Sequence, residues 1–120
     1  MASEKRTVLQ FTLSNGAQTL QLQKTLTEDL VGSAINGNQQ SVGTSWAALD
    51  LGTVATADLL CVVNTDATNF VQLATDNAGA KLFSKLTAGR MAFFPPDPSV
   101  TIYAKADTAA CVVQVQASVA

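Results

Sequence analysis

Hydrophobic and polar residues alternate along much of this chain with a period of two, which is typical of β-strands that bury one face. Residues 7–13 and 19–27 both show this alternation, with leucine or phenylalanine at successive odd or even positions. Between them lies Asn15-Gly16, a strong hairpin signal because both residues tolerate the positive φ of a type I′ turn. The two segments therefore predict a β-hairpin.

Residues 59–64 depart from strict alternation because they are apolar at successive positions as far as Asn64. A strand of this kind is buried on both faces and needs neighbouring strands and a covering layer on each side. We expect Leu59, Cys61 and Val63 to lie in the core. The other expected core residues are Leu9, Leu20, Phe70, Val71, Met91 and Val113.

Six further segments have strand character, with residues 81–86 also readable as a short helix because Leu82 and Leu86 are four apart. Its neighbours favour the strand. Trp46 is expected in the core, as is usual for a lone tryptophan in an alternating strand. The strands are predicted at residues 46–51, 69–74, 81–86, 91–94, 100–106 and 110–117.

Turn signals about 8 to 12 residues apart, with no credible long helix, are typical of a sandwich or barrel. The sequence predicts an all-β fold: a single-domain antiparallel β-sandwich of the jelly-roll type. We expect residues 1–6 to form an N-terminal arm and residues 7–120 to form the sandwich.

Residues 28–44 interrupt the strand pattern with glycines, asparagines and glutamines. Long connections in compact domains are usually functional or mobile, so this segment is a candidate contact arm. An ordinary exposed hairpin, with Ala34-Ile35 and Ser41-Val42 in its legs, explains the pattern equally well.

Charged residues make up only 13% of the chain, about half of the usual share. Gln, Asn, Thr, Ser and Ala take their place, and these side chains lose little when another protein covers them. A net charge of −2 without blocks of like charge offers no surface for nucleic acid or an anionic membrane. No apolar run approaches the ~20 residues of a membrane helix, and none follows the charged N-terminus as in a secretory signal.

The chain has no histidine, the commonest general base and metal ligand. Cys61 and Cys111 are expected to be buried free thiols, and a disulfide between them is the alternative. Four aspartates lie at turns, where such side chains usually bond their own backbone: Asp66, Asp76, Asp97 and Asp107. We expect no catalytic residue, no metal or cofactor and no small-molecule substrate.

Several short stretches follow Trp46: Leu49-Asp50-Leu51-Gly52, Val63-Asn64-Thr65-Asp66, Asn69-Phe70-Val71-Gln72-Leu73, Leu86-Thr87-Ala88-Gly89-Arg90 and Ile102-Tyr103-Ala104-Lys105-Ala106. Together they resemble a class of small structural proteins of tailed-bacteriophage virions. The resemblance covers roughly residues 46–106.

The resemblance implies a β-sandwich or jelly-roll protein of the virion, assembled in the host cytoplasm, of the capsid cement (decoration) type. Its expected partners are the major capsid protein and itself, as a homodimer or homotrimer. The alternative is a receptor- or glycan-binding module of a tail fibre or baseplate, which uses the same fold. The candidate contact residues are Lys5, Arg6, Leu30, Val31, Ile35, Asn36, Asn38, Gln39 and Gln40.

Overall fold

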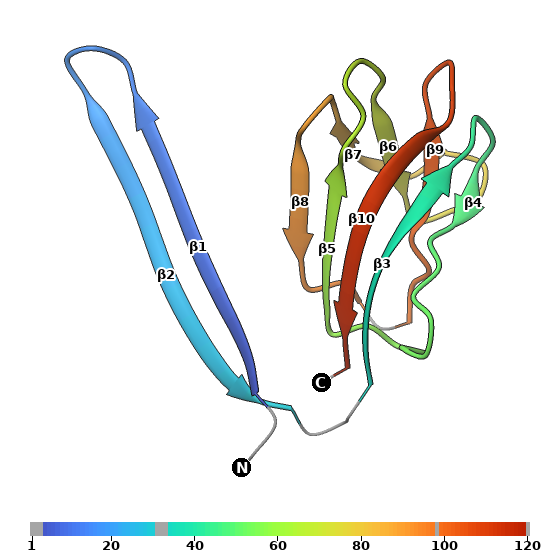
Figure 1. Cartoon of the computed structure of the whole chain (residues 1–120), viewed down its shortest axis with the longest axis horizontal. Coiled ribbons are helices and arrows are strands. Elements are labelled where there is room, and N and C mark those ends of the chain that lie inside the picture. The colour runs from blue at the N-terminus through green and yellow to red at the C-terminus, as the bar shows by residue number, and fades with distance from the viewer. Residues whose placement is uncertain (1–3, 31–33, 98, 120) are drawn as a thin grey trace. The chain divides into compact units, whose positions relative to one another are not determined.

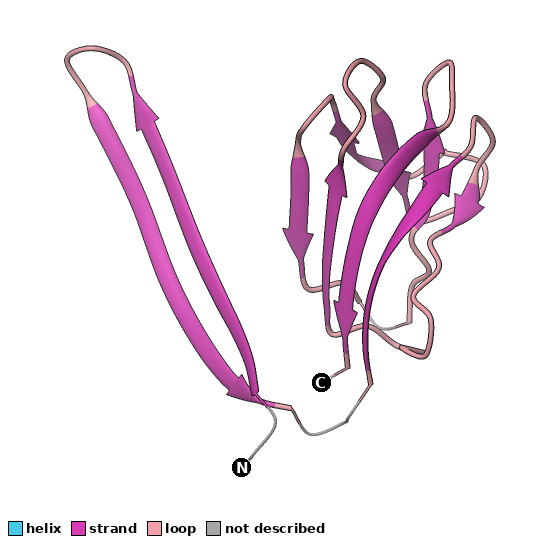
Figure 2. Ribbon diagram, viewed as in Figure 1, coloured by secondary structure: helices cyan, strands magenta, loops and turns pink. Residues whose placement is uncertain are grey.

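The computed structural model describes residues 4–30, 34–97 and 99–119, and every regular element within them is a β-strand (Figure 2). All strand pairings are antiparallel. The all-β prediction is therefore confirmed, including the choice of strand over helix at β7 (Leu82–Leu86).

The chain divides into two compact units, Met1–Ser33 and Ala34–Ala120 (Figure 1). We call the described part of the first unit the hairpin and the second unit the body. This division differs from the predicted boundary after Arg6, because residues 4–6 already pair within the first strand. The hairpin forms its own ladder from local contacts and does not belong to the sandwich.

The hairpin consists of β1 (Glu4–Ser14) and β2 (Thr19–Asp29), paired in register from Ser14↔Thr19 to Glu4↔Asp29. Its turn differs from the predicted type I′ turn. Gly16 has a φ of 70°, whereas no described non-glycine residue has a positive φ. The loop instead spans residues 15–18, and the Asn15 amide donates to the Gln18 carbonyl at 2.9 Å.

The body is a sandwich of two four-stranded antiparallel sheets (Figure 1). The first sheet has the order β3 (Ile35–Val42), β10 (Cys111–Ser118), β5 (Leu59–Asn64), β8 (Met91–Phe94). The second has the order β4 (Ala47–Ala48), β9 (Tyr103–Ala106), β6 (Val71–Ala74), β7 (Leu82–Leu86).

The core lies between the inner faces of these sheets, and the register decides which residues enter it. Val115 of β10 pairs with Val62 of β5, and Ala117 pairs with Leu60. The inward residues of β5 are therefore at even positions. Leu60, Val62, Val71, Leu73, Val113 and Val115 are all fully buried.

Several expected core residues lie elsewhere. Leu59, Cys61 and Val63 are half-buried on the outer face of the first sheet, because β5 is covered on one face only, the face of Leu60 and Val62, and not on both as predicted. Phe70 is half-buried at the start of β6. Leu9, Leu20 and Met91 are exposed. Val71 and Val113 are the two expected core residues that are fully buried.

Trp46 is half-buried and lies against a glycine rather than inside the core. A Cβ atom built on Gly79 would be 2.6 Å from three atoms of the Trp46 indole. Gly79 also has a φ of 73°, a conformation that side chains rarely adopt. The turn before β7 therefore requires glycine both for its backbone and for the ring beside it.

Candidate interaction surface

The predicted contact residues fall into different environments. Lys5 and Arg6 lie in β1 on opposite faces of the hairpin, so they do not form a free arm. Leu30 is half-buried just after β2, and Val31 lies outside the described residues. The remaining five residues all belong to β3.

Within β3, the predicted contact residues alternate between two sides. Asn36, Asn38 and Gln40 are half-buried, whereas Ile35 and Gln39 are exposed. The alternation has a structural cause, since Val42 on the inward side belongs to the core. Of the five predicted contact residues in β3, only Ile35 and Gln39 therefore point outward.

The inward amides of β3 hold the segment after β4 in place. The Gln40 side-chain amide donates to the Asp50 carbonyl at 2.9 Å, while the Asp50 amide donates back to Gln40 Oε1 at 3.0 Å. Asn38 Nδ2 donates to the same carbonyl at 3.3 Å. Asp50 lies outside the strands, and these side chains bond its backbone amide and carbonyl. The amides of Asn38 and Gln40 are therefore already used within the chain.

Half of the exposed large hydrophobic side chains of the described residues, seven of fourteen, lie on the hairpin. Each odd residue of β1 pairs with an even residue of β2, and directly paired residues lie on the same face of the hairpin. This face carries six large side chains that are 44 to 62% exposed. We call it the apolar hairpin face; its apolar members are Leu9, Phe11, Leu13, Leu20, Leu22 and Leu26.

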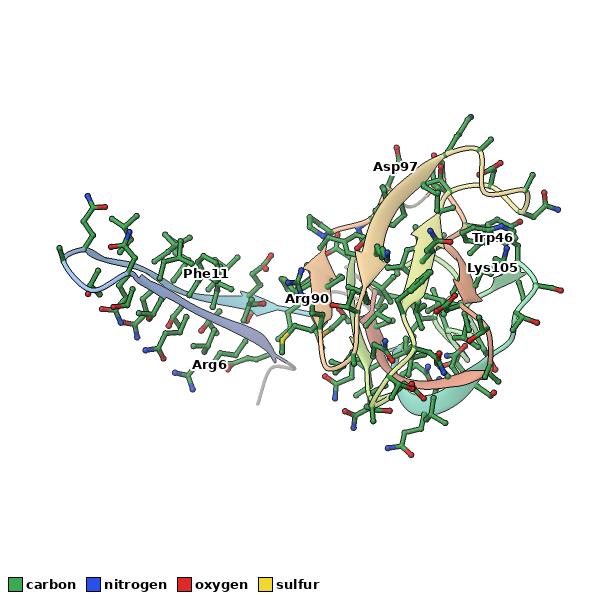
Figure 3. All side chains as sticks on the ribbon, turned by 90° about the horizontal axis from the view of Figure 1, so that it is seen from above. Arg6, Phe11, Trp46, Arg90, Asp97 and Lys105 are labelled. Carbon is green, nitrogen blue, oxygen red and sulfur yellow. The ribbon has the colours of Figure 1, made fainter. Side chains whose placement is uncertain are left out.

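The opposite face of the hairpin is polar, with Val8 as its one large apolar residue. Figure 3 shows Phe11 and Arg6 projecting from opposite sides of the hairpin ribbon. The polar face carries mainly Thr, Gln and Ser, in cross-strand pairs such as Gln10↔Gln23. The hairpin is thus strongly amphipathic, as a strand layer is when one face is covered by protein.

Charged residues mark the two ends of the apolar hairpin face differently. Lys5 pairs with Glu28 in the row next to the base, and Lys24 pairs with Leu9 in the middle of the face. The rows toward the turn, Phe11↔Leu22 and Leu13↔Leu20, are wholly apolar. The face therefore has an apolar tip and a base with both signs of charge.

A two-stranded hairpin has no second layer of its own and is at best marginally stable in water. Six exposed large apolar side chains on one face of such a hairpin are a larger apolar surface than scattered single residues. The hairpin is consequently the best candidate for a docking surface.

A smaller apolar strip lies on the outer face of the first sheet of the body. Met91 and Phe93 of β8 are 67% and 47% exposed, and they pair with Val63 and Cys61 of β5. Next to this strip, the outward residues of β10 change to glutamine at Gln114 and Gln116, which are exposed. The outer face is thus apolar over β5 and β8, whereas β10 presents the amides of Gln114 and Gln116 together with Val112, which is 46% exposed.

The body also contains a pocket of ≈ 230 Å³, with Leu49, Leu60 and Ile102 among the residues that line it. Asp97 contributes a carboxylate, but it accepts hydrogen bonds from the Ser99 amide at 2.9 Å and the Ser99 hydroxyl at 2.7 Å. These bonds lower the pKa of Asp97. The carboxylate is therefore held as an anion by its own turn.

Two further turn aspartates have the same role. Asp66 accepts hydrogen bonds from the amides of Asn69 at 2.6 Å and Thr68 at 3.0 Å, and these lower its pKa. Asp76 accepts from the amides of Lys81 and Ala80, and its pKa is lowered mainly by the bond from Lys81. The prediction that turn aspartates bond their own backbone is confirmed at these positions.

The two cysteines are free thiols in different surroundings. Cys111 is buried, and its pKa is raised by desolvation and then by the nearby carboxylates of Asp66 and Asp107. Cys61 was expected to be buried but is only half-buried, and desolvation also raises its pKa. Cys61 faces outward beside Phe93, so it is the more accessible thiol.

Within residues 4–30, 34–97 and 99–119, no group of three His, Cys, Asp or Glu side chains could hold a metal ion. The same part of the chain contains no helix that is long and apolar enough to cross a membrane.

Comparison with known proteins gives no relative. No protein-family model, curated protein or solved structure matches this chain.

Proposed function

We propose that this chain is a non-enzymatic structural protein of a tailed-bacteriophage virion, which self-associates and binds the capsid lattice as a cement or decoration protein. The observation that carries the proposal is the hairpin of residues 4–29, a separate unit with one uncovered apolar face. A hairpin of this kind is useful when another protein covers it.

The strand order of the body supports the jelly-roll part of the proposal. Successive strands from β3 to β6 lie in alternate sheets, and β7 to β10 alternate again. Eight strands wound as two interleaved Greek keys would give the orders β3-β10-β5-β8 and β4-β9-β6-β7, and this agreement supports a jelly roll. Jelly rolls of this type are common in viral capsid and lectin domains.

The surface of the body supports attachment to protein. Gln114 and Gln116 of β10 are exposed on the outer face of the first sheet next to the apolar side chains of β5, and Gln39 of the edge strand β3 is exposed beyond them. Neutral amides next to apolar side chains can be covered without burying charge, whose desolvation is expensive. This face suits contact with a capsid subunit.

The second candidate function is a receptor- or glycan-binding module of a tail fibre or baseplate. Two features favour this function: the pocket that Asp97 helps to line could hold a ligand, and lectin domains also use the jelly-roll fold. However, none of the described residues that line that pocket is aromatic, and Trp46 is placed against Gly79. Without an aromatic platform the pocket is a poor sugar site, so we prefer the cement function.

Quantitative mass spectrometry of purified virions from the encoding phage tests the proposal. A cement protein should be present at a copy number comparable to that of the major capsid protein. It should also bind empty capsids in a sedimentation assay. A few copies per particle would support the fibre module instead, and absence from virions would exclude both functions.

A further inference from the structure

We infer that the apolar hairpin face is covered by the same face of a second copy of this chain, with the two hairpins packed in parallel as a two-layer sandwich. The inference deepens the proposed function, on whose self-association it rests, by naming the surface and the geometry. The pairing register of β1 and β2 and the exposure of their apolar side chains support it.

Face-to-face packing is favoured over edge-to-edge pairing by what each would bury. Joining β1 or β2 to a strand of another copy would satisfy backbone groups but leave Phe11 and Leu22 in water. Stacking the faces removes these side chains from water, and sheets stack about 10 Å apart. The apolar face, rather than the strand edge, is the surface that needs cover.

The area available is sufficient for a stable interface. With ~200 Å² for each large side chain, the exposed fractions of the six residues amount to roughly 600 Å² per copy. Two copies would then bury roughly 1,200 Å² of apolar surface, at the lower limit of stable specific interfaces. The polar residues of the same rows would add to this area.

The charges at the base choose between the two symmetric ways of stacking the faces. With the two-fold axis along the strands, each row lies over the same row of the other copy, with β1 over the other β2. Lys5 then faces the partner's Glu28, and Phe11 faces the partner's Leu22. With the axis across the strands, Lys5 would face the partner's Leu13 and gain no acidic neighbour from the partner. The parallel arrangement is therefore preferred.

The apolar strip of the body is a poorer cover for this face. The ladder between β5 and β8 extends over only four residue pairs, from Leu60↔Phe94 to Val63↔Met91. The outward face beside it is occupied by Gln114 and Gln116, which match no apolar row. A second hairpin matches this face in length, its apolar tip rows meet apolar rows, and Lys5 meets Glu28 near the base.

The first experiment measures self-association of the full chain by sedimentation velocity in reducing buffer. The unmodified chain should be a dimer, and the double variant Phe11→Ser/Leu22→Ser should dissociate at least ~100-fold more easily. Val8→Ser is the matched control, because it removes an exposed apolar side chain from the same strand but from the polar face. A monomeric unmodified chain, a hairpin-dependent trimer, or equal loss in the control would overturn the inference.

The second experiment tests the parallel register by charge reversal. Lys5→Glu and Glu28→Lys should each weaken the homodimer, because each places like charges across the interface. Mixing the two variants should restore dimers, with heterodimers well above the one-half expected from random exchange in native mass spectra. A random mixture would exclude the parallel register. Circular dichroism of each variant checks that the strands remain folded.

The two proposals can fail separately. If the hairpin dimer forms but the chain is absent from virions, the cement function is wrong and the inferred surface stands. If the chain decorates capsids while Phe11→Ser/Leu22→Ser leaves its oligomeric state unchanged, the inferred surface is wrong and the cement function stands.

Discussion

The side-chain amide of Asn64 donates a 2.9 Å hydrogen bond to the backbone carbonyl of Leu86, and this bond joins the two sheets of the body. The same amide donates to the Asn69 carbonyl at 2.9 Å, and its Oδ1 accepts from the Asp66 amide at 3.0 Å. Asn64 is fully buried. A buried polar side chain is tolerated here because the surrounding backbone satisfies both its donor and its acceptor.

Replacing this amide should therefore destabilise the body. We expect Asn64→Leu to lower the free energy of unfolding by about 2 to 4 kcal/mol, since it leaves several backbone groups without their partner. Urea denaturation followed by circular dichroism measures the change. Asn77→Leu, at an exposed turn, is the control and should change stability by less than about 0.5 kcal/mol. Equal losses in the two variants would contradict a structural role for Asn64.

Three glycine substitutions separate backbone strain from steric overlap. Gly79→Ala should cost most, because its φ is 73° and its Cβ would overlap the Trp46 indole. Gly89→Ala has a φ of 77° but open space around the Cβ, so it should cost about 1 kcal/mol. Gly43→Ala has neither problem and should be neutral or slightly stabilising.

Tryptophan fluorescence gives a second readout for this series. Only Gly79→Ala should shift the emission of Trp46, because the ring must move to make room for the methyl group. If the three variants show the expected order of stabilities but the emission of Trp46 does not change in Gly79→Ala, the indole is not packed on Gly79.

Acid should weaken the body through its turn aspartates. Asp66, Asp76 and Asp97 all have pKa values lowered below 3.8 by hydrogen bonds to their carboxylates. Their stabilising contribution is therefore fully present above that unfolded-state value and is lost as the pH falls through the lower folded-state values. We expect the urea concentration at the midpoint of unfolding to decrease when the pH is lowered below about 4. The triple Asp→Asn variant should be less stable at neutral pH, and its stability should change less as the pH is lowered. If the stabilities of the variant and the unmodified chain fall in parallel with pH, the hydrogen bonds in the turns are not the cause.

Thiol labelling should distinguish the two cysteines. Cys61 is half-buried and should react slowly in the native protein, whereas buried Cys111 should react only after unfolding. Because desolvation raises the pKa of Cys61, its labelling rate should continue to rise above pH 9.0. Cys61→Ala should abolish native labelling, and Cys111→Ala should preserve it. Rapid reaction of both thiols would contradict the burial of Cys111.

The sequence predicted most strands because these have a local signature, but β3 (Ile35–Val42) was missed, since residues 28–44 were interpreted as a long connection or an exposed hairpin. The alternation at Cys111, Val113, Val115 and Ala117 correctly indicated one buried face of β10. In residues 59–64 the apolar residues are continuous, so periodicity could not show which face points inward. The outcome depended on the pairing of β5 with β10, which is a long-range contact.

The candidate surface was predicted as strands but not as a surface. The pattern of Leu9, Phe11 and Leu22 indicates that one face of the hairpin is covered. The same pattern would arise whether the chain's own sandwich or another molecule covers that face. The local sequence cannot distinguish these cases. The amides of Asn38 and Gln40 present the opposite case, because their hydrogen bonds to Asp50 depend on a segment ten or more residues away.

Removal of the hairpin should leave the body folded. The two units divide at Ser33 and Ala34, and the core of the body, from Val42 to Ala117, contains no hairpin residue. We expect a chain of residues 34–120 to unfold cooperatively, with a thermal midpoint within a few degrees of that of the full chain. The same truncation should abolish self-association, because it removes the apolar hairpin face. Deleting only residues 2–6 should have a milder effect, since it removes Lys5 but retains the apolar rows. Circular dichroism melting and sedimentation velocity on the three proteins measure both properties. An unfolded body would show that the sandwich depends on the hairpin, whereas a folded body that still dimerises would place the interface on the sandwich.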